Sequence, residues 1–171
     1  MGEVTFVEEY RTVDKSTWGD GPWQDEPDKA VWVDEATDLD CMIVRNNAGA
    51  LCGYVGVGPD HPLHGKGYDD VNDPYPDVHG GLTYANACQG SDDLSRFICH
   101  RTQPGRPDPV WWFGFDCAHS MDVCPGMDAR LREIGHEPMR YSGDGWRDTY
   151  RDVPYVIGQV TSLAAQLSAT P

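Results

Sequence analysis

Residues 110–118 read Val-Trp-Trp-Phe-Gly-Phe-Asp-Cys-Ala (VWWFGFDCA), and this stretch decides the fold. Aromatic residues favour strands, and Pro109 marks the end of the preceding irregular segment. Successive side chains of a strand point to opposite faces. One face therefore carries Trp111, Phe113, Phe115, Cys117 and His119, and the other carries Trp112, Gly114, Asp116 and Ala118. We expect residues 110–118 to form the strongest strand of the protein.

The segment from Asp152 to Ser168 has a different period. Its apolar residues recur at steps of three and four, which is typical of an amphipathic helix. They are Val153, Val156, Ile157, Val160, Leu163, Ala164 and Leu167. Asp152 is suited to the N-cap, and Pro154 falls in the first turn, where proline is tolerated. We expect this apolar stripe to pack on one face of the sheet.

Three further segments, 29–34, 40–46 and 51–57, have the β-branched character of strands. The Asn-Asn-Ala-Gly sequence at 46–49 joins the last two with residues that tolerate left-handed backbone angles, so a hairpin is predicted. Residues 81–85 add a short strand, residues 127–134 a short helix, and residues 143–145 a turn.

The predicted fold class is thus α+β: a twisted antiparallel sheet of about five strands with a C-terminal amphipathic helix packed on one face. Residues 1–28, rich in Gly, Pro and Asp toward their end, are interpreted as an N-terminal arm or loop, and residues 29–171 as a single α+β domain. Two long loops, 58–80 and 86–109, are expected to gather near the end of strand 110–118.

The charge of the chain restricts its partners. Its 171 residues include 13 Lys and Arg but 28 Asp and Glu, for a formal net charge of −15. Because phosphate contacts need basic side chains, direct binding to nucleic acid is not expected, and neither is binding to an anionic membrane. The acidic first ten residues do not resemble a secretory signal. We therefore expect a cytoplasmic location, in which the six cysteines are thiols or metal ligands.

The cysteines give weak signals of their own. None occurs in a C-x-x-C pair. Cys88, Cys99 and His100 suit a zinc site by residue type, but an ordinary loop is the simpler interpretation. Cys117 and His119 share a strand face and thus resemble a thiol with its base, although a cysteine in such an apolar strand is usually a small buried group.

Histidine and aspartate are concentrated in the irregular segments. Five of the six histidines lie between positions 61 and 119, in the strings His61-Pro-Leu-His64, Asp77-Val-His79-Gly80 and Asp116-Cys-Ala-His119 followed by Asp122. Imidazole and carboxylate groups suit zinc, manganese or iron. If the loops converge, His64, His79 and His119 supply three nitrogen ligands, with Asp77 or Asp116 as a fourth or supporting group.

A metal ion with an open position lowers the pKa of bound water and generates hydroxide for hydrolysis. On this hypothesis Asp116, His119 and His79 are the catalytic residues, and Lys66 or Arg151 contacts an anionic ligand. The simpler alternative is that the histidines bond to loop backbone, that the aspartates cap turns, and that the basic residues pair with carboxylates.

Four strings, at residues 52–71, 77–85, 110–122 and 149–167, resemble a group of uncharacterised proteins carried by actinobacterial phages and related mobile elements. They contain HPLHGKGYDDV, DVHGGLTYA and WWFGFDCAHS. The resemblance covers about residues 20–168 and implies a protein that acts in the cytoplasm of a bacterial host. It brings no activity with it, but it adds Tyr68, Asp69 and Asp70 to the candidate ligand-binding residues. Asp77-Val-His79-Gly80 also resembles the first metallophosphoesterase motif, but the later motifs of that family are absent.

Two classes of function remain. The first is a small hydrolase that uses a divalent metal ion, zinc or manganese, on a phosphorylated or nucleotide-like ligand. The second is a non-enzymatic counter-defence protein that binds a host protein as an acidic mimic of nucleic acid, or that sequesters a signalling nucleotide. A structural accessory protein of the phage particle is a third possibility. The sequence leaves the oligomeric state open.

Overall fold

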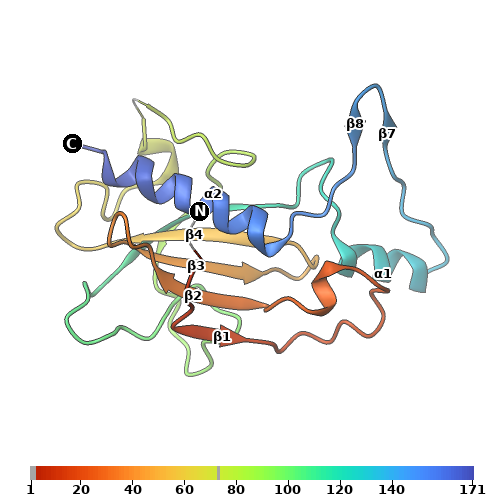
Figure 1. Ribbon diagram of the computed structural model, residues 1–171, viewed down its shortest axis with the longest axis horizontal. Helices are drawn as coiled ribbons and strands as arrows, with labels where there is room; N and C mark the ends of the chain where they lie inside the picture. Colours follow the sequence, from red (N-terminus) through yellow and green to blue (C-terminus); the bar gives the residue numbers. More distant parts are fainter. Residues whose placement is uncertain (1–2, 73) are drawn as a thin grey trace.

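The computed structural model describes residues 3–72 and 74–171 and confirms the α+β class (Figure 1). Its main sheet has six strands in the order β1-β2-β3-β4-β6-β5, and every neighbouring pair is antiparallel. The strands are β1 (Glu8–Tyr10), β2 (Lys29–Val33), β3 (Asp40–Arg45), β4 (Leu51–Val57), β5 (Tyr84–Ala87) and β6 (Trp111–Asp116). The sequence assigned residues 1–28 to an arm or loop, whereas β1 extends the sheet at the β2 edge.

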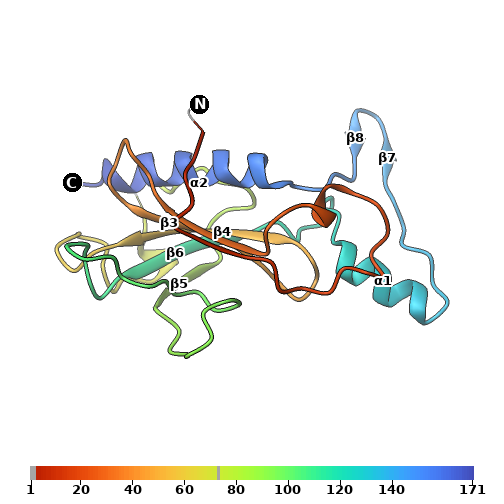
Figure 2. The same ribbon diagram turned by 60° about the horizontal axis from the view of Figure 1, so that its bottom comes forward.

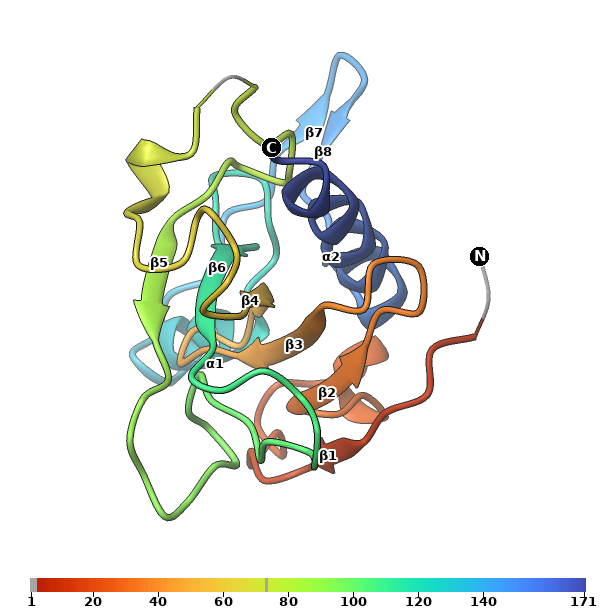
Figure 3. The same cartoon turned by 90° about the vertical axis from the view of Figure 1, so that its left-hand side faces the viewer.

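Helix α2 (Val153–Ser168) lies across one face of the sheet, as predicted (Figures 2 and 3). Asp152 is its N-cap, since the carboxylate accepts a hydrogen bond of 3.0 Å from the backbone N–H of Tyr155. The helix packs closely on β4 because position 53 is a glycine. A Cβ there would lie 2.6 Å from Val160 Cγ2 and 2.5 Å from the ring of Phe115.

The alternation predicted for strand β6 is confirmed. Phe113, Phe115 and Cys117 are buried beneath α2, while Trp112 is buried in a second apolar cluster on the opposite face. No helix of the described residues covers that second face. The loop that follows β5 covers it instead, with Cys88 and Ile98 packed against the cluster.

A disulfide joins Cys88 to Cys99 and closes this loop. The expectation that all six cysteines are thiols or ligands is therefore wrong for this pair. Cys41, Cys52, Cys117 and Cys124 are free and buried. The loop is also tied to the sheet by Lys29, which is fully buried and donates hydrogen bonds to the carbonyl oxygens of Leu94, Phe97 and Cys99.

Helix α1 (Pro125–Glu133) and a small hairpin lie beyond one end of the sheet (Figure 1). The helix begins two residues before the predicted segment, with proline at its first position. The predicted turn at 143–145 joins a two-stranded hairpin, β7 (Ser142–Gly143) and β8 (Trp146–Arg147). Two 3-10 turns, at Pro22–Gln24 and Tyr68–Asp70, complete the regular structure.

Candidate metal centre

The candidate site lies where the chain leaves β6. Asp116 ends the strand, Cys117 is buried, and the chain then turns through His119 to Asp122. The turn closes on itself: Asp122 N–H donates to the carbonyl oxygen of His119 at 2.9 Å, and His119 N–H donates to Asp122 Oδ2 at 3.0 Å. An aspartate that accepts such local bonds stabilises a tight turn, so His119 and Asp122 are held on one side of it.

His79 reaches the same place from the long loop before β5. Its backbone N–H donates to Gln159 Oε1 at 2.8 Å, and its ring Nδ1 lies 2.8 Å from the hydroxyl of Tyr155. Both partners belong to α2, so the helix positions this histidine. Gly80 follows with a φ of +68°, and a Cβ at this position would overlap the ring of His119. The glycine thus allows the two histidine segments to approach closely.

Two histidine side chains converge on one carboxylate oxygen. His79 Nε2 lies 2.7 Å from Asp122 Oδ2, and His119 Nδ1 lies 3.4 Å from the same oxygen. Suitable ligand atoms of all three residues lie within 4.8 Å of one another. Asp116 stands at the edge of the group, with Oδ1 3.8 Å from His119 Nδ1. The arrangement is a cluster of two imidazoles and one carboxylate, a ligand set that suits zinc, manganese and iron.

Arg151 completes the cluster. Its Nε donates to Asp122 Oδ1 at 3.0 Å, and its guanidinium carbon lies 4.9 Å from the centre of the Tyr155 ring. Neither Nη atom donates a hydrogen bond to another of the described residues, and the side chain is 24% exposed. A cation with free donors therefore stands beside the candidate ligands.

The electrostatics of the cluster centre on Asp122. Burial by itself would raise the pKa of this carboxyl group, but hydrogen bonds from His79, from His119 N–H and from Arg151 outweigh burial and hold the pKa well below its usual value. Asp122 is therefore an anion at neutral pH, as a metal ligand must be. Burial also raises the pKa of Tyr155 above its usual value, so the hydroxyl keeps its proton.

The side chains of the cluster differ in their exposure to solvent. The Asp122 side chain is 2% exposed and that of His79 13%, whereas His119 is 38% and Asp116 31% exposed. A ligand in contact with solvent would thus approach over His119 and Asp116.

The structure brings together only part of the predicted site. His79, His119, Asp116 and Arg151 are assembled, but His64 is not, and the expected convergence of three histidines is corrected to two. His64 Nε2 lies 3.2 Å from the carbonyl oxygen of Pro109, and its ring lies beside Trp111. That contact is at the beginning of β6, whereas the cluster lies beyond its end.

The other predicted ligands also lie away from the cluster. The carbonyl oxygen of Lys66 accepts a hydrogen bond from Trp111, which places this segment at the beginning of β6 as well. Tyr68, Asp69 and Asp70 follow in an exposed 3-10 turn, where Asp70 caps the N–H of Gly67. Asp77 is exposed, and its backbone N–H and carbonyl oxygen both bond to the side chain of Gln166.

Both long loops were expected to gather near the end of strand 110–118, but only the first does. Residues 78–80 reach the cluster, but residues 88–109 leave β5 beside Trp111 and cover the opposite face. Two residues of the observed cluster had no role in the predicted site. Asp122 stood in the histidine-aspartate string without a role, and the three-residue step from His119 was the available signal. Tyr155 was not among the predicted site residues, and no local signal in the sequence distinguishes it.

Comparisons give no guide to function, since no protein-family model, curated protein or solved structure matches the chain. Neither helix in the described part of the chain has both the length and the apolar character needed to cross a lipid bilayer.

Proposed function

We propose that this protein is a divalent-metal-dependent hydrolase that acts on a small phosphorylated or nucleotide-like molecule, with zinc or manganese bound by His79, His119 and Asp122. The convergence of His79 and His119 on Asp122 Oδ2 carries the proposal. Two ligand atoms 2.0–2.2 Å from a tetrahedral ion lie about 3.3–3.6 Å apart. The 3.4 Å between His119 Nδ1 and Asp122 Oδ2 meets this requirement, and the 2.7 Å from His79 Nε2 needs to lengthen by roughly half an ångström.

The support around His79 also fits a ligand. A histidine that binds a metal through one nitrogen usually donates a hydrogen bond from the other, which fixes the orientation of the ring. His79 Nδ1 has such a partner in the hydroxyl of Tyr155. Nε2 is therefore the atom that faces the metal position, and its present hydrogen bond to Asp122 is the bond that an ion would replace.

The charges of the site support an anionic ligand. A divalent ion and Arg151 contribute +3, while Asp116 and Asp122 contribute −2, which leaves a net charge of +1 in a protein of charge −15. The free Nη atoms of Arg151 suit the oxygens of a phosphate group. The ion would lower the pKa of a bound water, and Asp116, on the solvent side, is the carboxylate that we assign to accept the proton of that water.

The test begins with metal binding. We expect isothermal titration with Zn²⁺ and Mn²⁺ to show a site that is lost in His79→Ala and in His119→Ala. His136→Ala, at an exposed position outside the cluster, is the matched control. Metal-loaded protein should hydrolyse bis(p-nitrophenyl) phosphate, p-nitrophenyl phosphate or a nucleotide from a panel, and a chelator should stop turnover. Unchanged metal affinity in both histidine variants would refute the proposal.

A net charge of −15 favours one alternative, a counter-defence protein that binds the basic groove of a host protein or sequesters a signalling nucleotide. Exposed carboxylates occur both in the loop between β2 and β3, as at Glu35, and in the turn between β7 and β8, as at Asp144, so they are not confined to one segment of the surface. Turnover separates the two functions, because an enzyme consumes excess ligand, whereas a binder saturates at one equivalent. For either function, we propose that the protein is encoded by a phage or a related mobile element and acts in the cytoplasm of its bacterial host.

A further inference from the structure

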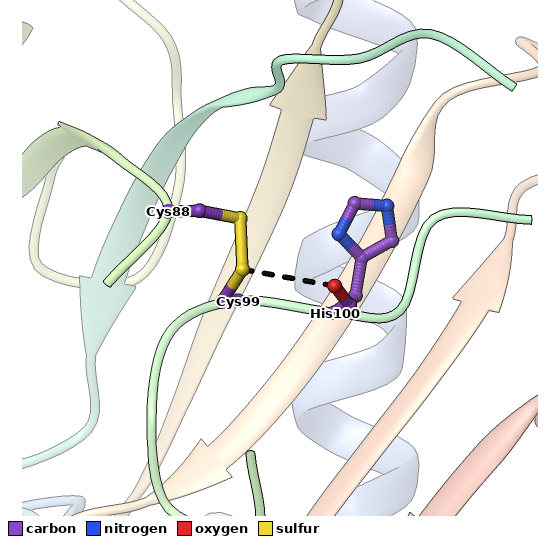
Figure 4. A group of neighbouring side chains, drawn as sticks. All are labelled: Cys88, Cys99 and His100. Atoms are coloured by element: carbon purple, nitrogen blue, oxygen red, sulfur yellow. Dashed lines mark hydrogen bonds between the residues drawn. A yellow bond between two sulfur atoms is a disulfide. The ribbon is translucent and has the colours of Figure 1, made fainter. Parts of the chain in front are cut away.

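The loop closed by the disulfide brings three metal-binding side chains together. Cys88 is the first residue after β5, Cys99 at the other end of the loop is bonded to it, and His100 is the next residue (Figure 4). Suitable ligand atoms of these three residues lie within 4.8 Å of one another. They lie on the opposite face of the sheet from the cluster of His79 and His119, against Trp112.

His100 is the unusual member of this group. Its side chain is only 4% exposed, yet neither ring nitrogen has a hydrogen-bond partner among the described residues. Its ring meets Trp112 edge-on, at 5.1 Å between centres, so the aromatic contact holds its orientation. Buried polar groups in native proteins nearly always have a partner. A buried imidazole whose two nitrogens make no hydrogen bond is therefore a candidate ligand.

The two nitrogens face different groups. Nε2 lies 3.8 Å from Asp40 Oδ2, too far for a hydrogen bond but close enough to form one after a small shift. In Figure 4 the other nitrogen, Nδ1, lies on the side of the two sulfur atoms. A carboxylate behind one nitrogen and a metal before the other is the usual arrangement of a metal-bound histidine.

We propose that the reduced form of this protein binds a zinc ion through Cys88 Sγ, Cys99 Sγ and His100 Nδ1, with water in the fourth position and Asp40 orienting the imidazole. The disulfide and the zinc site are then two states of the same residues. The proposal is independent of the hydrolase function, since it uses none of the residues of that site.

The change from the disulfide to the zinc site takes two steps, reduction and metal binding. A dithiol reductant transfers two electrons and two protons to the Cys88–Cys99 bond, which breaks to give two thiols, and the reductant becomes a disulfide. Zinc then replaces the two thiol protons, which leave to solvent, and forms two Zn–S bonds. The sulfurs must separate to about 3.8 Å, since each lies about 2.3 Å from the ion in a tetrahedral site.

The surroundings favour two thiolates. The ammonium group of Lys29 is buried and donates to the carbonyl oxygen of Cys99 at 2.6 Å, so a positive charge stands next to the site. A nearby cation stabilises a thiolate over a thiol. In a reducing cytoplasm a disulfide does not persist, and the zinc ion would take over its role of closing the loop. That loop forms one wall of a cleft of about 310 Å³, to which it contributes Gln89, Ser95, Arg96 and Ile98.

Cobalt substitution tests the proposal. Protein reduced with a phosphine, and freed of it under nitrogen, is titrated with Co²⁺. We expect a thiolate-to-cobalt charge-transfer absorption, which a site of histidine and aspartate cannot produce, and its displacement by Zn²⁺. Cys99→Ser and Cys88→Ser should each abolish or strongly weaken the band, and His100→Gln should shift it.

Three controls make the result specific. Oxidised wild-type protein keeps the fold but has no thiolate at the site, so it should give no band. Cys124→Ser, which removes a free cysteine outside the group, and His119→Ala, which disables the proposed hydrolase site, should both retain it. Absence of the band in reduced wild-type protein, or its persistence in both cysteine variants, would overturn the zinc site and leave the hydrolase proposal untouched.

Discussion

The hydroxyl of Tyr155 lies 2.8 Å from Nδ1 of His79, and this contact joins α2 to the loop that carries the histidine. The Asp122 carboxylate can only accept, so the shared proton belongs to His79 Nε2, and in the neutral ring Nδ1 accepts the hydrogen bond from the tyrosine. If a metal ion replaced the Nε2 proton, the ring proton would lie on Nδ1, which would then donate to the tyrosine oxygen. Tyr155 can serve both states because a hydroxyl group both donates and accepts.

Removal of this hydroxyl should weaken metal binding without removing a ligand. We expect Tyr155→Phe to lower the affinity for Zn²⁺ by about 10- to 100-fold, the usual effect of losing a hydrogen bond that orients a ligand. Tyr141→Phe is the control, since Tyr141 is exposed near the hairpin. Isothermal titration of both variants measures the effect. Equal affinities for Tyr155→Phe and wild type would show that the hydroxyl does not orient His79.

Arg151 is expected to act on the substrate more than on the metal. In Arg151→Gln the free guanidinium nitrogens are lost, so KM for a phosphorylated substrate should rise by roughly 10-fold, about 1.4 kcal/mol of binding. Metal affinity should fall less, because His79, His119 and Asp122 remain. Arg147→Gln, at an exposed position in the hairpin, serves as control. A KM that stays the same while metal binding collapses would assign Arg151 a purely structural role.

Asp28 should be essential for stability. Its Oδ1 lies 2.7 Å from Lys15 Nζ and 2.8 Å from Arg45 Nε, and its Oδ2 accepts from the N–H groups of Thr12 and Val13. Asp28→Asn leaves the buried Lys15 without its carboxylate partner and leaves Arg45 with Glu26 alone, at 3.3 Å, so we expect a loss of about 3–5 kcal/mol in the free energy of unfolding. Asp20→Asn, at an exposed position, should be near neutral. Urea denaturation compares the two variants.

The carboxylate of Asp28 should also make the free energy of unfolding depend on pH in the acidic range. Burial alone would raise the pKa of Asp28, but hydrogen bonds from Lys15, Val13 and Arg45 outweigh it and hold the pKa below the ordinary value of 3.8. The folded state therefore binds the proton less readily than the unfolded state. The stabilisation is complete above that ordinary value and declines as the pH falls toward the lower, folded-state pKa. The stability difference between wild type and Asp28→Asn should narrow over this interval, and a constant difference would contradict the account.

Gly53 tests the contact between α2 and β4. A methyl group there would press on Val160 and Phe115, which are fully buried, so we expect Gly53→Ala to destabilise the protein by about 1–3 kcal/mol. Gly143→Ala is the matched control, since nothing lies within 4 Å of a Cβ at that position. Thermal unfolding followed by circular dichroism measures both. A Gly53→Ala protein as stable as wild type would mean that the helix shifts at little cost.

The fold was largely predictable because its main signals are local. Alternation in residues 110–118 and the three- and four-residue steps after Asp152 report which face of each element is buried. Strand β1 was not predicted because its three residues, Glu8 to Tyr10, are too few to show an alternating pattern. Their strand is made by pairing with β2, a partner about twenty residues away.

The site was only half predictable for a related reason. His79 and His119 were identified by residue type, but which residues join them depends on how distant segments dock. Tyr155 belongs to the site only because α2 crosses the sheet above the His79 loop, and His64 is excluded because its segment runs to the other end of β6. The pairing of Cys88 with Cys99 was likewise not encoded by spacing, since eleven residues separate them without a recognisable motif.

The position of α2 in the chain has a consequence for synthesis on the ribosome. Every strand that the helix covers precedes it in the sequence. The apolar side of the sheet therefore stays exposed until residues 153–168 have left the ribosome. During that interval a nascent chain exposes Phe113 and Phe115 and is prone to self-association. Tyr155 and Gln159 belong to the same helix, so His79 gains these two hydrogen-bond partners when the helix covers the sheet. Chains that end before α2 should therefore be poorly soluble and should not bind a metal ion.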